Sequence, residues 1–191
     1  FDDSNPDASW VQPMANPTSA FTWSFWMNPD SIVGKTTQTL YNQYDGGSTQ
    51  GMLLQFVNDD IQVWIDNSFT SNYKWYTNPL AAGDTIWKHF ALSWRSSDGK
   101  TKLYLDGAMV DSSFSTDAGT LAWPWGNGGF ICTNSDETFD GYLDEYRVES
   151  TNRSDDWIKL CYETQKLDQS AVTFGTFTLQ SGNYKYWAAS G

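Results

Sequence analysis

The stretch 87–110 constrains the fold of this chain most strongly, because its apolar residues recur at every second position. Phe90, Leu92 and Trp94 share one face of its first half, and the residues between them share the other face. Successive side chains of a β-strand point to opposite sides of a sheet, so this alternation predicts a half-buried strand. A turn cluster follows at 96–99, with a glycine that can adopt a positive φ.

The second half of the stretch returns in the opposite direction. Leu103 and Leu105 alternate with polar residues, and Asp106 followed by Gly107 is a second turn signal. A chain that runs up, reverses, runs down and reverses again builds an antiparallel sheet. The stretch therefore predicts an all-β fold.

Other segments show a similar strand pattern, bounded by Gly, Pro, Asn and Asp. We expect a short edge strand near Trp10 and Val11, and further strands at 21–27, 39–44, 51–57, 61–66, 73–78, 130–133, 142–149 and 172–177. The 191 residues suit one domain. We expect that domain to span residues 1–179, with 180–191 as a C-terminal tail or linker.

The segment 142–149 contains an irregularity. Leu143 lies out of phase with Tyr146 and Val148 in a regular strand. A β-bulge near residues 144–145 would bring the three side chains to one face, so we expect a bulge there.

The C-terminal part of the chain predicts one short helix and holds one of the two cysteines. Ser154 is positioned to cap a helix over 155–163, with two aspartates in its first turn. Cys161 falls in this helix, and Cys132 falls in a strand-like run. The sequence leaves two alternatives open for these cysteines. They are either two buried free thiols or a disulfide that ties the helix to the sheet.

Four motifs occur in order along the chain. They are FTWSFWMNPDS at 21–31, the hairpin at 87–110, FDGYLDEYRV at 139–148 and RSDDWI at 153–158. In this order they resemble the laminin-G-like, concanavalin A-like lectin-glucanase jelly-roll domains, with a strand order similar to that of the pentraxins. The resemblance implies a two-sheet antiparallel β-sandwich, a jelly-roll with one short helix near the C-terminus.

The charge balance narrows the class of partner. Eleven Lys and Arg against 23 Asp and Glu give a formal net charge of −12. A nucleic-acid partner needs clustered basic residues, and an anionic membrane surface attracts them, so we expect neither partner. No stretch of about 18 apolar residues is present to span a membrane. The low charged fraction favours an extracellular protein, secreted or on a cell or virion surface.

The residues give little support for catalysis. His89 is the only histidine, and we interpret it as a structural residue in a covered strand. Glucanases of this fold carry a Glu-x-Asp-x-Glu pattern that puts three carboxylates on one strand face. The nearest stretch here runs from Glu145 to Glu149, with Arg147 at its centre. We therefore expect no enzymatic activity, with glycoside hydrolysis as the less favoured alternative.

Aromatic side chains in loop-like surroundings indicate carbohydrate binding, because a ring stacks on the apolar face of a pyranose. The candidates are Trp75, Tyr76, Trp123 and Trp125. The alternative is that these rings cap the end of the sandwich. Trp23, Trp94 and Trp157 are instead expected in the core.

An acidic loop is a candidate calcium site. Asn134, Asp136 and Glu137 put three oxygen-bearing side chains within four residues, and Ca²⁺ prefers such oxygen ligands. The resemblance to pentraxins implies a further ligand from the turn after an earlier strand, which would be Asp45. The alternative is a solvated acidic loop. Calcium is the one cofactor expected.

The resemblance implies a non-catalytic extracellular recognition module, attached to or assembled with something larger. The favoured ligand is a glycan. The main alternative is a structural or adhesive module on a cell or virion surface, whose partner is a protein.

Overall fold

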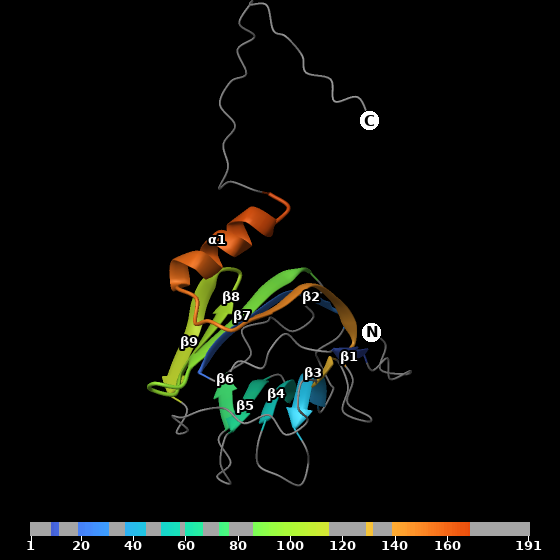
Figure 1. The fold of residues 1–191 in the computed structure, drawn as a ribbon. Coiled ribbons are helices and arrows are strands. Elements are labelled where there is room, and N and C mark those ends of the chain that lie inside the picture. Colours follow the sequence, from blue (N-terminus) through green and yellow to red (C-terminus); the bar gives the residue numbers. More distant parts are fainter. Residues whose placement is uncertain are drawn as a thin grey trace, which may run out of the picture.

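The computed structural model describes residues 9–11, 19–30, 37–44, 51–57, 60–66, 73–76, 86–114, 129–131 and 139–168 (Figure 1). These residues form strands and one helix. The strands are β1 (Ser9–Val11), β2 (Ala20–Pro29), β3 (Thr37–Tyr44), β4 (Gly51–Val57), β5 (Asp60–Asp66), β6 (Tyr73–Tyr76), β7 (Lys88–Arg95), β8 (Lys100–Leu105), β9 (Ala108–Phe114), β10 (Gly129–Ile131) and β11 (Gly141–Glu149). The helix is α1 (Asp155–Gln165).

The strands form two antiparallel sheets. The six-stranded sheet has the order β1-β10-β3-β4-β5-β6, and the five-stranded sheet has the order β11-β2-β7-β8-β9. The sheets lie in two layers, and α1 lies on the outer side of the five-stranded sheet (Figure 1). The expected all-β sandwich with one short helix is confirmed. The expected strand at 172–177 lies outside the described residues.

The core fills the space between the two sheets. Its buried members are Phe21, Trp23, Phe25, Met27, Leu40, Tyr41, Met52, Leu54, Phe56, Ile61, Val63, Ile65, Phe90, Leu92, Trp94, Leu103, Leu105 and Phe139. Most come from alternate positions of the strands, as a period of two requires. Leu40 and Tyr41 are consecutive because the register of β3 shifts there, and Phe139 precedes β11. The predictions for Trp23 and Trp94 are confirmed, whereas Trp157 packs half-buried against a smaller cluster around Ile158.

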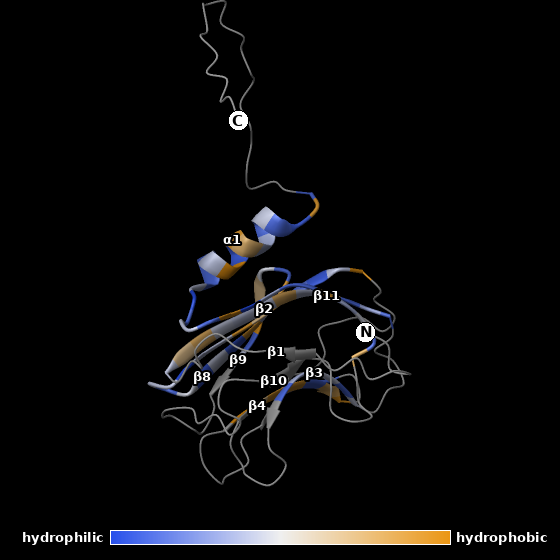
Figure 2. Cartoon of the chain, turned by 45° about the vertical axis from the view of Figure 1, so that its right-hand side comes forward, coloured by the Kyte–Doolittle hydropathy of each residue, from blue (hydrophilic) through white to orange (hydrophobic). Residues whose placement is uncertain are grey.

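Strand β7 differs from the half-buried strand that its sequence predicts, because both of its faces are buried. His89, Ala91 and Ser93 on the outer face are at most 2% exposed. Helix α1 covers that face, with Ile158 packed against Ala91 and Tyr104. Figure 2 shows the helix over the outer side of the sheet. The prediction that His89 sits in a covered strand is therefore confirmed.

Polar contacts hold the first turn of α1 on the sheet. The Ser154 side chain accepts a hydrogen bond of 3.2 Å from the Trp157 amide, as an N-cap does. Lys102 Nζ and the Tyr104 hydroxyl donate to Asp155 Oδ1 over 2.6 Å and 2.7 Å. These bonds, the Lys102 bond first, lower the pKa of Asp155. The predicted cap is confirmed, and the helix ends two residues later than expected.

Strand β11 contains the predicted bulge. Its register against β2 shifts between Asp144 and Arg147, and Glu145 adopts a φ of 51°. The shift lets Leu143, Tyr146 and Val148 all pack against the core, as predicted. The bulge leaves Glu145 in a left-handed conformation that non-glycine residues rarely adopt.

Within the described part of the chain, no helix has the length and apolar character needed to cross a lipid bilayer.

Candidate functional site

The aromatic residues predicted for carbohydrate binding stay predictions. Trp75 and Tyr76 belong to β6, at the edge of the six-stranded sheet, and their side chains lie outside the described part. Trp123 and Trp125 lie wholly outside the described residues.

The predicted calcium ligands also remain untested. Asp45, Asn134, Asp136 and Glu137 lie outside the described residues. Among the residues that are described, no group of three or more His, Cys, Asp or Glu could hold a metal ion.

The cysteine pairing stays open. Cys161 is a partly buried free thiol in α1, and burial raises its pKa. Cys132 lies outside the described residues.

The two glutamates of the hydrolase alternative each face an arginine. Glu145 pairs with Arg147, and Glu149 Oε1 lies 2.6 Å from the guanidinium of Arg153. Arg153 also lies 4.5 Å from the ring centroid of Trp157. These ion pairs are contacts that support the strand and the start of α1.

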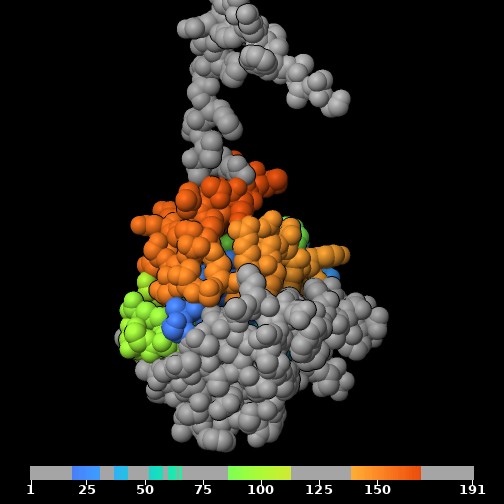
Figure 3. Space-filling view, in the orientation of Figure 1, coloured from blue at the N-terminus to red at the C-terminus, as the bar shows by residue number. Residues whose placement is uncertain are grey.

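A groove opens on the outer face of the five-stranded sheet, at the C-terminal end of α1. It encloses about 520 Å³ and is lined by Trp26, Trp87, Asp144, Glu145, Gln165 and Leu167. A volume of this size falls within the range of small-ligand sites. Figure 3 shows α1 in red-orange beside β11 in orange on one surface of the molecule.

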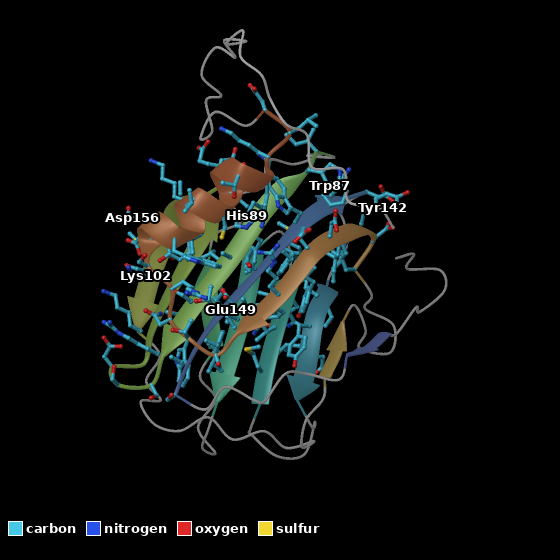
Figure 4. The ribbon with its side chains drawn as sticks, turned by 45° about the horizontal axis from the view of Figure 1, so that its top comes forward. Trp87, His89, Lys102, Tyr142, Glu149 and Asp156 are labelled. Atoms are coloured by element: carbon cyan, nitrogen blue, oxygen red, sulfur yellow. The ribbon has the colours of Figure 1, made fainter. Side chains whose placement is uncertain are left out.

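The strand register explains why these residues meet. Trp26 of β2 lies directly between Asp144 of β11 and His89 of β7. Tyr142 lies two residues from Asp144 in β11, so it shares the outer face. Trp87 directly precedes β7, two residues from His89. Figure 4 shows Trp87 and Tyr142 beyond the end of α1 and His89 beside the helix.

Trp26 is held in one orientation. Its indole N–H donates a hydrogen bond of 2.9 Å to Gln165 Oε1. Its ring meets His89 edge-on at 5.3 Å between centroids and stacks with Tyr162 at 5.8 Å. Burial lowers the pKa of His89 to about 4, so this imidazole is neutral at physiological pH. The ring of Trp26 is therefore a rigid part of the groove wall.

Trp87 supplies an open aromatic surface. Its side chain is 45% exposed, and that of Tyr142 nearby is 59% exposed. Exposed aromatic rings beside a groove are the kind of surface on which sugar rings stack.

Two carboxylates form the opposite wall. Asp144 Oδ1 accepts a hydrogen bond of 2.8 Å from the backbone N–H of Glu145, and both side chains are exposed. This bond supports the left-handed conformation of Glu145. The six lining residues include no Lys, Arg or His, so the groove is rich in hydrogen-bond acceptors.

The sequence predictions missed this groove, although one signal for it was visible. Trp26 is a large aromatic residue on the face of β2 opposite Phe25 and Met27. A tryptophan on a face expected to meet solvent indicates that something covers or binds that face. The partner residue Gln165 gives no such signal.

The chain matches the family model described as the concanavalin A-like lectin/glucanases superfamily over residues 3–159. It therefore belongs to that superfamily. The curated relatives include a sushi, von Willebrand factor type A, EGF and pentraxin domain-containing protein 1 from Rattus norvegicus. It is 27% identical over 123 residues, which are 64% of this chain and 3% of the relative. The Mus musculus protein of the same name is 25% identical over the same length.

Solved structures with the same fold include binding domains of botulinum neurotoxins. That of neurotoxin DC in complex with SialylT has a TM-score of 0.69 and 12% identity, covering 84% of this chain and 40% of that one. That of serotype D has a TM-score of 0.68 and 19% identity, covering 85% and 42%. The neurotoxin DC domain is also solved with rat synaptotagmin II, at a TM-score of 0.63 and 10% identity, covering 78% and 37%. This chain therefore spans less than half of those binding domains.

Proposed function

We propose that this chain is a non-catalytic extracellular recognition module that binds a glycan in the groove at the C-terminal end of α1. The observation that carries the proposal is the groove itself. It combines a fixed tryptophan, an exposed tryptophan and two carboxylates. Aromatic faces stack on sugar rings, and carboxylates accept hydrogen bonds from sugar hydroxyls.

The comparisons support a binding role. The neurotoxin domains that share the fold are named as binding domains, one in complex with SialylT and one with synaptotagmin II. The first complex favours a glycan and the second a protein. The groove favours a glycan here, because its lining combines two tryptophans with two carboxylates and a glutamine.

The absence of catalysis is also part of the proposal. Glu145 and Glu149 both pair with arginines, and His89 lies beneath α1. A carboxylate held in an ion pair is poorly placed to act on a glycosidic bond. The wild type should therefore show no hydrolytic activity, and Glu145→Gln and Glu149→Gln should not change this result.

The proposal is tested by glycan-array binding followed by titration calorimetry with the best ligand. Trp87→Ala should weaken binding at least about tenfold, because it removes the exposed stacking surface. Leu160→Ala is a matched control, since Leu160 is an exposed apolar residue of α1 outside the groove. Its affinity should equal that of the wild type.

Other outcomes would move the site or overturn the proposal. Loss of binding in Trp75→Ala or Trp125→Ala, with Trp87→Ala unchanged, would assign the glycan to the loops predicted from the sequence. No glycan binding, together with stable self-assembly or capture of a cell-surface protein, would favour the adhesive alternative.

A further inference from the structure

The charge of the groove narrows the class of glycan that it can hold. Its lining carries two carboxylates, and the chain as a whole has a net charge of −12. Arg147 pairs with Glu145, so a sialylated or sulfated ligand would meet Asp144 as the main negative charge of this wall. Like charges at close range repel each other, so the groove disfavours acidic sugars.

The hydrogen-bonding capacity of the lining points the same way. Gln165 Oε1 already accepts the indole N–H of Trp26, so that N–H is not free to donate to a ligand. The ionised carboxylates of Asp144 and Glu145 can only accept. Gln165 Nε2 and the indole N–H of Trp87 are donors in the lining, whereas the Asp144–Glu145 wall offers acceptors, so donors of a ligand would pair with this wall.

The tryptophans favour a cationic donor over a neutral one. The face of a tryptophan ring attracts a positive charge, and this attraction grows when the cation loses water. An ammonium group placed between Trp87 and Asp144 would meet both an aromatic ring and a carboxylate. Charge-assisted hydrogen bonds of this kind are stronger than those of a neutral hydroxyl.

The bulge sets the position of Glu145, which has a φ of 51° within β11. Here the bulge turns Glu145 out of the strand alternation and onto the groove wall. Arg147 neutralises part of that charge and Asp144 remains, so the wall keeps a negative balance.

We propose that the groove selects saccharides that carry a free amino group, with the ammonium bound between the Asp144–Glu145 wall and the tryptophans. This inference rests on the proposed glycan-binding function and names its ligand class. The same groove should bind N-acetylated sugars weakly and sialylated sugars not at all.

The test compares sugars that differ in charge, two of which share the same β-1,4-linked sugar chain. Titration calorimetry at pH 6 would measure the β-1,4-linked tetramer of glucosamine, the matching tetramer of N-acetylglucosamine, and sialyllactose. The glucosamine tetramer should bind at least about tenfold tighter than the N-acetylated one, as one charge-assisted bond provides. Sialyllactose should show no binding. Added salt should weaken the binding of the glucosamine tetramer more than the binding of the other sugars.

Matched variants assign the preference to the groove. The double change Asp144→Asn, Glu145→Gln keeps the side-chain shapes and removes both charges, so the preference should fall to about twofold or less. The double change Asp111→Asn, Asp156→Asn removes equal charge from exposed positions outside the lining and should leave the preference intact. Trp87→Ala should weaken the glucosamine tetramer.

The outcomes separate this inference from the function on which it rests. Equal binding of the two tetramers, lost in Trp87→Ala, would leave the glycan site standing and overturn the charge preference. Binding of the glucosamine tetramer could instead survive both Trp87→Ala and the Asp144, Glu145 double change. Such binding would reflect general attraction to an acidic chain, and this result would also overturn the charge preference. No binding of any sugar would overturn both.

Discussion

The indole N–H of Trp26 in β2 donates a hydrogen bond of 2.9 Å to Oε1 of Gln165, at the last residue of α1. The two residues lie 139 positions apart in the chain. The bond therefore joins the second strand to the end of the helix and closes one side of the groove. Any change that lifts α1 from the sheet should change the groove as well.

Gly107→Ala should lift α1 in this way. Gly107 has a φ of 74°, and a Cβ built there would lie 2.9 Å from Cδ1 of Tyr162 in α1. The left-handed backbone costs about 1–2 kcal/mol for a non-glycine residue, and the contact with Tyr162 adds to this. Chemical denaturation should show a loss of about 2 kcal/mol or more. In a Tyr162→Ala background the loss should shrink toward the backbone term alone. An equal loss in both backgrounds would contradict the contact with Tyr162.

The unfolding free energy should fall between pH 6.5 and about 4 because of His89. The imidazole is neutral in both states above pH 6.5, its usual pKa, and burial lowers its folded pKa to about 4. The charge of Asp106 raises this pKa and that of Arg147 lowers it, each by less than burial does. As the pH falls, the unfolded chain binds a proton before the folded chain does, so stability is lost, by on the order of 3 kcal/mol.

Denaturant titrations at a series of pH values would measure this loss. Asp and Glu also titrate near its lower end, so the quantity to compare is the difference in slope between the wild type and His89→Gln. The slope above pH 5 should be shallower in His89→Gln. Parallel profiles would mean that His89 does not control the acid response.

Trp94→Ala should cost about 3–5 kcal/mol of stability, as the truncation of a large core side chain does. Trp94 is 1% exposed and stacks on Phe21 with 5.5 Å between ring centroids. Trp87→Ala is the matched control, because it removes the same side chain at a 45% exposed position. Its cost should stay below about 1 kcal/mol. Denaturant melts in which the two variants lose equal stability would contradict this account of the core.

Glu145→Gly should be more stable than Glu145→Ala. Both variants lose the ion pair with Arg147, but only glycine adopts the φ of 51° without cost. The difference in unfolding free energy should be about 1 kcal/mol. Both variants should lose the preference for amino sugars, so greater stability would accompany weaker recognition. An alanine variant as stable as the glycine variant would show that the bulge carries no strain.

Calcium binding by the 134–137 loop and Asp45 remains a prediction. A bound ion stabilises the native state by about 2.7 kcal/mol at a hundredfold excess over Kd. The melting temperature should therefore rise with millimolar calcium and fall with chelator. The double change Asp136→Asn, Glu137→Gln should remove the response. Melting curves that superimpose with and without chelator would rule out the site.

The sequence predicted the sheet because strand periodicity is local. The alternation through Phe90, Leu92 and Trp94 identifies the core face without knowledge of any partner strand. The turn at Asp106 and Gly107 is equally local, since both residues have positive φ values of 50° and 74°. The cap at Ser154 is local too, because it depends only on the helix turn that directly follows it.

The groove could not be predicted in this way, because it depends on where α1 lies. The helix sequence sets the length and the apolar stripe of α1, but not the strand beneath it. The contact between Trp26 and Gln165 depends on the placement of α1, in which Ile158 packs on Ala91. The bulge at Asp144 and Glu145 was predicted, whereas its role as a groove wall was not.

The position of α1 also decides where a self-sufficient fragment can be cut. The family match ends at residue 159, in the middle of the helix, whereas Tyr162 and Gln165 still contact Trp26. A truncation at 159 would leave part of the outer sheet face, around Trp26 and His89, open to water. Such a fragment would keep its sandwich core but would expose an aromatic surface that is prone to aggregation. Limited proteolysis should therefore yield a stable fragment whose C-terminus lies beyond Gln165.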